Sequence, residues 1–435
     1  MRRGLLMLVL LMMSWPQGWA YPIDGYDHTG IRRLNFYDLA QTGEVDGRKL
    51  LPGQLQTMAQ IKPRLLGSTM PFDFEPDADY GRQLVAMLGE DAAEYGVSLL
   101  DLSDPSAPIY AEHNAGIRNN VGSVGKMLVG IAFFQKLAEL YPDDIEARHR
   151  LLKDTRIVAD EFVISDHHKA VFWNPETREF AFRAIEVGDE GSLYDWLDWM
   201  LSASSNAAAS TVQEQLILLT HFGREYPVSE ERKAAFFKAE GAAGLGKIFL
   251  TAMNDGVVDN GLNPDLVRQG SFFTRTGKNR VAGTSSYGNP RELVHLLLLM
   301  EQGRLVDDYS STELKRLLYM TQRRIRYASH PALNEYAVYF KSGSLYSCRP
   351  EEGFRCRKYM GNKLNLLASL AVVEGPGTSL DYHYLVVVSS NVLYVNSAVA
   401  HQTLAMRIHR MIEARRRGDK QSGSAQPVPA SAGAR

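Results

Sequence analysis

The first part of the chain shows a helical and then an extended pattern of apolar positions. Apolar residues recur at helical spacing within residues 79–94, and residues 96–102 that follow are rich in valine and leucine, which is typical of a buried strand. The turn residues Asp104 and Pro105 then precede a short return strand at residues 109–112. This region therefore predicts a helix followed by two antiparallel strands.

The end of the chain has the same extended character. Residues 335–345 alternate in side-chain type and predict an edge strand, and two more strands are expected at residues 366–373 and 382–390, joined by the turn at residues 375–377. Residues 397–415 predict a closing helix, because their basic last turn complements the helix dipole.

Between these two regions the pattern is helical. Residues 127–134 are apolar on nearly every face, so this helix should be buried rather than amphipathic. Ser192 and Asp195 form a capping box that opens a tryptophan-rich helix ending near Ser202. Three alanines after Asn206 begin another helix.

Three short polar motifs lie at the ends of these elements: Ser123-Val124-Gly125-Lys126, Ser204-Ser205-Asn206 and Lys341-Ser342-Gly343. Ser123 and Lys126 are one helical turn apart, so their side chains share a face and the lysine can exchange a proton with the serine. The backbone N–H of a residue in the first turn of a helix has no helical partner and can hold a developing oxyanion. Each motif alone can be a helix-capping loop or a surface lysine, but their order favours an active-site serine.

In this order, S-x-x-K, S-x-N and K-[ST]-G resemble the motifs of the penicillin-recognising serine hydrolases, namely the class A β-lactamases and the D-alanyl-D-alanine peptidases. The resemblance covers residues 79–414. It implies an α/β fold of the α+β type, in which helices flank a five-stranded antiparallel sheet. The hydrolase domain would span residues 79–415, with a mostly helical subdomain at about residues 123–330 inserted between the two halves of the sheet.

The resemblance also implies a role for each matching position. Ser123 would form an acyl-enzyme, Lys126 would accept its proton because the nearby Lys341 lowers the lysine pKa, and Ser204 would relay a proton to the leaving nitrogen. It assigns catalysis to Ser123, Lys126, Ser204 and Lys341, the oxyanion hole to the backbone N–H groups of Ser123 and Ser344, and substrate binding to Asn206, Ser342 and Gly343.

The second half-reaction has no matching motif. Class A β-lactamases are expected to carry E-x-x-L-N after S-x-N, with the glutamate activating the deacylating water, and no such match lies between Asn206 and Lys341. Glu240 stands at a suitable separation and is the candidate for this role. Long intervals between the motifs predict insertions at residues 154–188 and 220–239.

Two other motifs point to functions that their context does not favour. Residues 241–247 fit G-x-x-x-x-G-K, but Ile248 replaces the hydroxyl residue that would hold Mg²⁺. Asp166-His167-His168 resembles a metal site, yet adjacent side chains diverge and no further ligand lies at a suitable spacing, so a solvated loop is predicted. Neither a metal nor another cofactor is expected.

Composition and the termini indicate an exported protein. The chain has 435 residues and a formal charge of −2, which gives no reason to expect a nucleic-acid partner. Residues 1–20 form a signal peptide, so the mature periplasmic chain would begin at Tyr21 and contain no transmembrane segment. Cys348 and Cys356 are predicted to pair in that compartment as a hairpin staple, since a redox role would favour C-x-x-C.

The remaining segments leave the function open. Residues 21–78 are expected to pack on the main domain or on a protein partner, and residues 416–435 are expected to be disordered. Three functions fit: a hydrolase of D-alanyl stem peptides of peptidoglycan, a β-lactamase with an unusual deacylation residue, and a catalytically slow protein that binds the cell wall or a partner.

Overall fold

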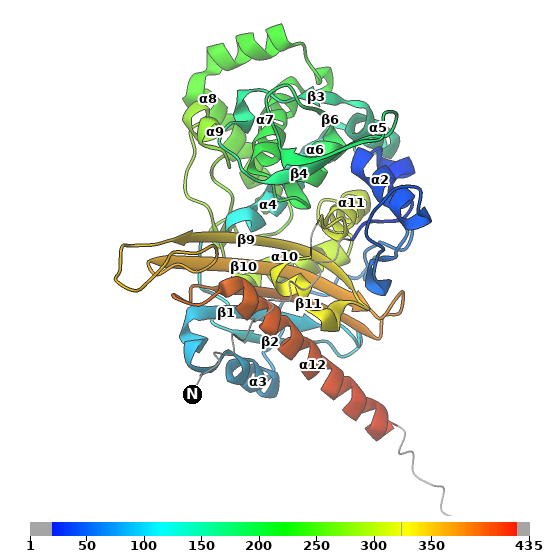
Figure 1. Ribbon diagram of the computed structural model, residues 1–435, viewed down its shortest axis with the longest axis vertical. Helices are drawn as coiled ribbons and strands as arrows, with labels where there is room; N and C mark the ends of the chain where they lie inside the picture. Colours follow the sequence, from blue (N-terminus) through cyan, green and yellow to red (C-terminus); the bar gives the residue numbers. More distant parts are fainter. Residues whose placement is uncertain (1–19, 323, 424–435) are drawn as a thin grey trace, which may run out of the picture.

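The computed structural model describes residues 20–322 and 324–423. The expected α+β fold is confirmed: one antiparallel sheet has the strand order β2-β1-β11-β10-β9, and helices cover both of its faces (Figure 1). The strands are β1 (Tyr95–Asp101), β2 (Ile109–His113), β9 (Ala337–Ser347), β10 (Leu364–Gly375) and β11 (Tyr382–Ser390). The strand predicted at residues 335–345 lies at the sheet edge, as expected.

The central strand β11 shows how the sheet separates two cores. Tyr384, Val386 and Val388 are buried on the face covered by α3 (Ala78–Leu88) and α12 (Ser397–Gly423). Leu385 and Val387 point to the opposite face and join the larger core. The continuous apolar run in this strand follows from its burial on both faces.

Most of the chain between β2 and β9 forms a helical layer above the second face of the sheet (Figure 1). The capping box predicted at Ser192 is present, with Ser192 Oγ accepting from the Asp195 backbone N–H at 3.1 Å. The helices are α4 (Lys126–Leu140), α5 (Ile145–Asp154), α6 (Leu193–Leu201), α7 (Asn206–Phe222), α8 (Glu230–Val258), α9 (Arg275–Arg280), α10 (Pro290–Glu301) and α11 (Asp308–Tyr319). Three small two-stranded sheets complete this layer: β3 (Arg156–Val158) with β6 (Glu190–Ser192), β4 (Lys169–Asn174) with β5 (Glu179–Ala184), and β7 (Val267–Arg268) with β8 (Tyr287–Gly288).

The chain termini differ in part from the expectation. Helix α12 continues to Gly423, so residues 416–423 belong to a helix rather than to the expected disordered tail. Arginine, lysine and glutamine are good helix formers, which explains the continuation. Residues 424–435 and residues 1–19 of the predicted signal peptide lie outside the described residues. Within the described ranges, no helix combines the length and apolar character needed to cross a bilayer.

The N-terminal extension packs against the helical layer, where α1 (Gly25–Thr29) and α2 (Arg32–Thr42) lie near α11 and β4 (Figure 1). Ile31, Leu34 and Ile61 are at most 1% exposed and belong to the same core as the helical layer. Arg33 forms a buried ion pair with Asp198 of α6 at 2.5 Å and donates to the Met320 carbonyl at 2.8 Å. The extension is thus part of the folded body, and a protein partner for it remains a prediction.

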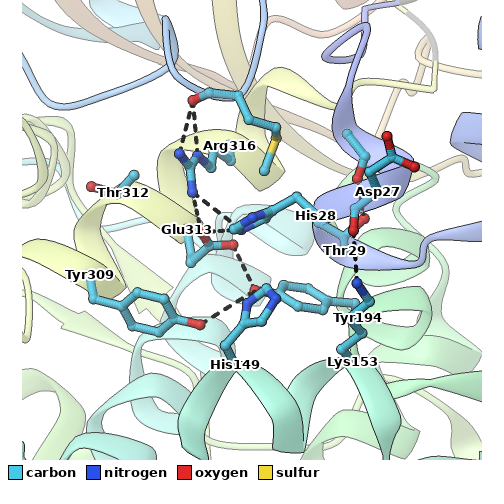
Figure 2. A network of polar contacts seen from close by, with 12 residues as sticks. Asp27, His28, Thr29, His149, Lys153, Tyr194, Tyr309, Thr312, Glu313 and Arg316 are labelled. Atoms are coloured by element: carbon cyan, nitrogen blue, oxygen red, sulfur yellow. Dashed lines mark hydrogen bonds and ion pairs between the residues drawn. The ribbon is translucent and has the colours of Figure 1, made fainter. Parts of the chain in front are cut away.

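Figure 2 shows a polar network that joins the extension to three helices. Buried Glu313 of α11 accepts hydrogen bonds from Tyr194 of α6 at 2.9 Å and from Arg316 at 2.5 Å, and it contacts His28 of the extension at 3.2 Å. Burial alone would raise the pKa of Glu313, but His28 and Arg316 hold it below its ordinary range. Lys153 of α5 adds a 2.7 Å hydrogen bond to the Asp27 carbonyl.

We predict that the Arg33→Met variant will lose about 3–5 kcal/mol in free energy of unfolding, because it leaves the Asp198 carboxylate buried without its partner. Urea unfolding of the full chain measures this loss. The control is Arg82→Met, since the Arg82–Asp79 pair is 70% and 76% exposed and should contribute about 0–1 kcal/mol. Equal losses for the two variants would contradict the anchoring role of Arg33.

Candidate active site

Ser123 lies in a 3₁₀ turn, Gly122–Gly125, that leads directly into α4. Strand β9 contacts this turn at Gly343, where an added Cβ atom would lie 2.0 Å from the Val121 carbonyl oxygen and 2.4 Å from the Ser123 nitrogen. The sequence predicted that Gly343 would admit a substrate backbone. The structure gives the glycine another reason, because only a residue without a side chain lets β9 approach the turn that carries Ser123.

The two expected oxyanion donors lie on either side of this contact. Strand β9 is at the sheet edge, so the Ser123 turn lies against its outer side. An added Cβ atom on Gly122 would lie 3.0 Å from the Ser344 nitrogen. Ser123 and Ser344 both line one cavity, and their role as oxyanion donors stays a prediction.

Lys126 lies behind Ser123 with its amine fully buried. Its Nζ atom is 3.1 Å from Ser123 Oγ, 2.5 Å from the Ser204 carbonyl oxygen and 2.8 Å from Asn206 Oδ1. The pKa of Lys126 is lowered to about 7, as expected, but the cause is burial rather than the predicted charge of Lys341, and the Asp166 carboxylate acts in the opposite direction. A neutral amine can therefore donate to the two carbonyl oxygens and accept the proton of Ser123.

The loop between α6 and α7 presents two further groups to the site. Ser204 has a left-handed backbone, with φ of 60°, which turns its carbonyl toward Lys126. Its hydroxyl accepts a 2.7 Å hydrogen bond from Lys341 Nζ on β9. Burial, followed by the charges of Lys126 and Arg326, holds the pKa of Lys341 well below its ordinary value.

Arg326 lines the cavity, although no motif marks it in the sequence. Its guanidinium donates to Ser342 Oγ at 2.6 Å and to Ser344 Oγ at 3.1 Å, and it stacks on Tyr359 at 4.6 Å from the ring centre. The Arg326 guanidinium makes the β9 side of the cavity positive. An anionic group of a ligand would be favoured here.

Asp166 and His168 also belong to the site, and the predicted solvated loop is wrong for Asp166. Its side chain is 2% exposed, and its carboxylate accepts from Ser205 Oγ at 2.8 Å and from the Ala207 N–H at 2.9 Å. His168 Nδ1 lies 2.6 Å from the same carboxylate. The loop folds against the start of α7, a contact that no local sequence pattern reveals.

These groups surround a cavity of about 1230 Å³ between β9 and the helical layer, which is large enough for an extended ligand. The structure brings the predicted site residues to this cavity or directly behind it, except for Glu240 and the two cysteines. The predicted residues that line it are Ser123, Ser204, Asn206, Lys341, Ser342, Gly343 and Ser344, and they are joined by Asp166, His168, Phe273 and Arg326, which were not predicted as site residues.

Glu240 is not brought to this cavity. It lies exposed on α8, next to Gly241, whose φ of 59° interrupts the helix, and it is not among the residues that line the cavity. Residues 242–247, the end of the phosphate-loop-like motif, are helical here and do not form a loop that could enclose a phosphate. Cys348 and Cys356 form the predicted disulfide in the segment between β9 and β10, with an S–S distance of 2.04 Å.

One buried group in the described part of the chain has the spacing of metal ligands: Glu301, Glu374 and His383. Lys315 Nζ already binds Glu301 at 2.8 Å and also binds Glu374. Its ammonium takes the place that a cation would need, so this cluster is a structural ion pair network.

Comparisons with known proteins agree with the fold. No protein-family model matches the chain, and no curated protein matches it. The solved structure of PBP-A is 14% identical, with a TM-score of 0.50, and the match covers 80% of this chain and 100% of that chain. The structure of the TLA-1 extended-spectrum β-lactamase is 12% identical, with a TM-score of 0.51 over 78% of this chain and 99% of that chain. The chain therefore has the fold of the serine β-lactamases and penicillin-binding proteins.

We predict that the rate at which a fluorophosphonate labels Ser123 will rise with pH through a midpoint near 7. The neutral form of Lys126 accepts the serine proton, and its pKa of about 7 means that this form is lost as the pH falls. Gel-based labelling rates between about pH 5 and about pH 9 provide the measurement. A rate that stays constant over this range would contradict the role of Lys126 as the base.

Proposed function

We propose that this chain, which has the fold of the serine β-lactamases and penicillin-binding proteins, is a serine hydrolase that cleaves an amide through an acyl-enzyme at Ser123. The observation that carries the proposal is the buried Lys126 amine at 3.1 Å from Ser123 Oγ. Its two other partners are carbonyl oxygens, which leaves its lone pair for the serine proton.

In the proposed acylation step, Ser123 Oγ attacks the amide carbonyl while its proton passes to Lys126 Nζ. The backbone N–H groups of Ser123 and Ser344 would hold the carbonyl oxygen as it gains charge. Ser204, whose hydroxyl is hydrogen-bonded to Lys341, would deliver a proton to the leaving nitrogen. The amide bond breaks and an ester to Ser123 forms.

The charge of the cavity favours a substrate with a carboxylate beside the reacting amide. The Arg326 guanidinium, which donates to Ser342 Oγ, gives this side of the cavity its positive charge, and Lys341 adds hydrogen-bond donors. The carboxamide of Asn206 would bind the amide side chain of the substrate. D-alanyl stem peptides of peptidoglycan and β-lactams both combine an amide carbonyl with a nearby carboxylate, so either class fits. The disulfide supports export to the periplasm, where both occur.

The second candidate is a true β-lactamase, because the TLA-1 extended-spectrum β-lactamase shares the fold. A catalytically slow protein that binds the cell wall or a partner through residues 21–78 is less favoured. The complete Ser123, Lys126 and Lys341 arrangement argues for catalysis, and Arg33 and His28 hold the extension against the helical layer.

We predict that a fluorescent penicillin will label the purified protein at Ser123 and that the Ser123→Ala variant will not be labelled. The reason is that the Lys126 amine activates this hydroxyl. Gel fluorescence and peptide mass spectrometry identify the labelled site. A fluorophosphonate serves as a second probe, because it can react even when a cavity does not admit penicillin. Equal labelling of the two proteins by both probes would contradict the assignment.

A chromogenic cephalosporin should distinguish a peptidase from a β-lactamase. Because a peptidase would be acylated faster than it is deacylated, we expect one stoichiometric burst of colour from a peptidase and many turnovers from a β-lactamase. Stopped-flow absorbance at known protein concentration gives the number of turnovers. The Ser123→Ala variant should show neither behaviour.

We predict that material exported to the periplasm will begin at Tyr21 and contain no free thiol. The start at Tyr21 follows from the predicted signal cleavage after Ala20, and the absence of a free thiol follows from the bond between Cys348 and Cys356. Intact mass before and after alkylation, with and without reduction, tests both. Alkylation of Cys348 without reduction would exclude the disulfide in that material.

A further inference from the structure

A carboxylate and an imidazole are hydrogen-bonded inside the cavity. Asp166 Oδ1 lies 2.6 Å from His168 Nδ1, and the same oxygen accepts from the backbone N–H groups of His167 and His168 at 2.8 and 3.2 Å. The Asp166 side chain is 2% exposed, whereas the His168 side chain is 44% exposed and lines the cavity. The carboxylate is thus fixed and the imidazole is accessible.

The Asp166 carboxylate is also tied to the part of α7 that contacts Lys126. Its second oxygen accepts from Ser205 Oγ and from the Ala207 N–H, while Asn206 between them accepts from Lys126 Nζ at 2.8 Å. The first turn of α7 therefore sets the position of His168 relative to Lys126. His168 is near enough to Lys126 for the imidazole to respond whenever that amine becomes charged.

The hydrogen bond to Asp166 fixes the tautomer of His168. An ionised carboxylate can only accept, so Nδ1 carries the proton and Nε2 carries the lone pair. Burial lowers the pKa of His168 despite its bond to Asp166. In the part of the chain that the structure describes, no residue forms a hydrogen bond with Nε2, so this atom is free to bind water.

We propose that His168 is the general base that activates water for hydrolysis of the acyl-enzyme and that Asp166 is its positioning residue. This proposal rests on the acyl-enzyme at Ser123. His168 Nε2 takes a proton from water as the water oxygen bonds to the ester carbonyl carbon. The bond from that carbon to Ser123 Oγ then breaks, and Ser123 Oγ regains a proton through Lys126 or His168. The products are a carboxylic acid and free Ser123.

Other groups are less suited to this role. Glu240 is exposed on α8 and does not line the cavity. Both oxygens of Asp166 already accept hydrogen bonds, and its pKa is held below the ordinary range by His168, Ala207 and Ser205 in spite of burial. A carboxylate held in this way is a weak base, whereas it can orient an imidazole effectively.

The test compares acylation and deacylation of the full-length His168→Gln variant with those of the wild type. Each protein receives a pulse of fluorescent penicillin and then an excess of unlabelled penicillin, and the label on Ser123 is followed over time. We expect acylation within about threefold of the wild-type rate and deacylation at least about 100-fold slower. His167→Gln is the matched control, because His167 binds Asp166 through its backbone N–H, which the substitution keeps, and this variant should deacylate like the wild type.

A second variant separates catalysis from a structural role. In His168→Gly, added imidazole should restore deacylation, because it can occupy the space beside Asp166. Restoration by imidazole would not follow if His168 only supported the loop. Variants of Asp166 are unsuitable, since this carboxylate also binds Ser205 and the start of α7.

The outcomes are distinguishable. Deacylation of His168→Gln within about threefold of wild type would overturn the role of His168, and so would a slow His168→Gly variant that imidazole does not accelerate. Failure of the proposed function would look different, because neither wild type nor any variant would carry label on Ser123.

Discussion

The site depends on keeping the Lys126 amine out of water. Burying an unpaired ammonium costs several kcal/mol, and the protein offsets part of this cost with three oxygen partners from Ser123, Ser204 and Asn206. Burial also lowers the pKa of Lys126 to about 7, which gives the amine a use as a base. The left-handed backbone of Ser204 and the start of α7, where Ser205 caps the helix, each present an oxygen to the amine.

Elements far apart in the sequence hold these partners in place. Strand β9 reaches the Ser123 turn because Gly343 has no side chain, and it brings Lys341 to Ser204. The N-terminal extension supports the opposite side. Arg33 binds Asp198 of α6, just before the Ser204 loop, and also the Met320 carbonyl, next to the cavity. The extension is therefore a structural support of the site rather than an appendage.

The sequence predicted the parts of the site that depend on local patterns. Lys126 follows Ser123 by one helical turn, and the alternating side-chain types of residues 335–345 predicted an edge strand that carries Lys341. Both positions could therefore be inferred. Asp166 could not, because its burial depends on a loop that folds onto the first turn of α7, about 40 residues later. Arg326 reaches Ser342 from a 3₁₀ turn that precedes β9, and no motif marks it. The end of α12 was placed too early because composition alone does not mark a helix end.

The most direct test of the account is the pKa of Lys126 itself. Protein carrying ¹³C at the lysine ε-carbon can be titrated by NMR, and the Lys126→Ala variant identifies the resonance by its loss. We expect a Lys126 resonance that titrates with a midpoint near 7, well below the ordinary lysine value of 10.5. A Lys126 resonance that titrates only near 10.5 would contradict the account, because the amine would then be charged whenever Ser123 has to lose its proton.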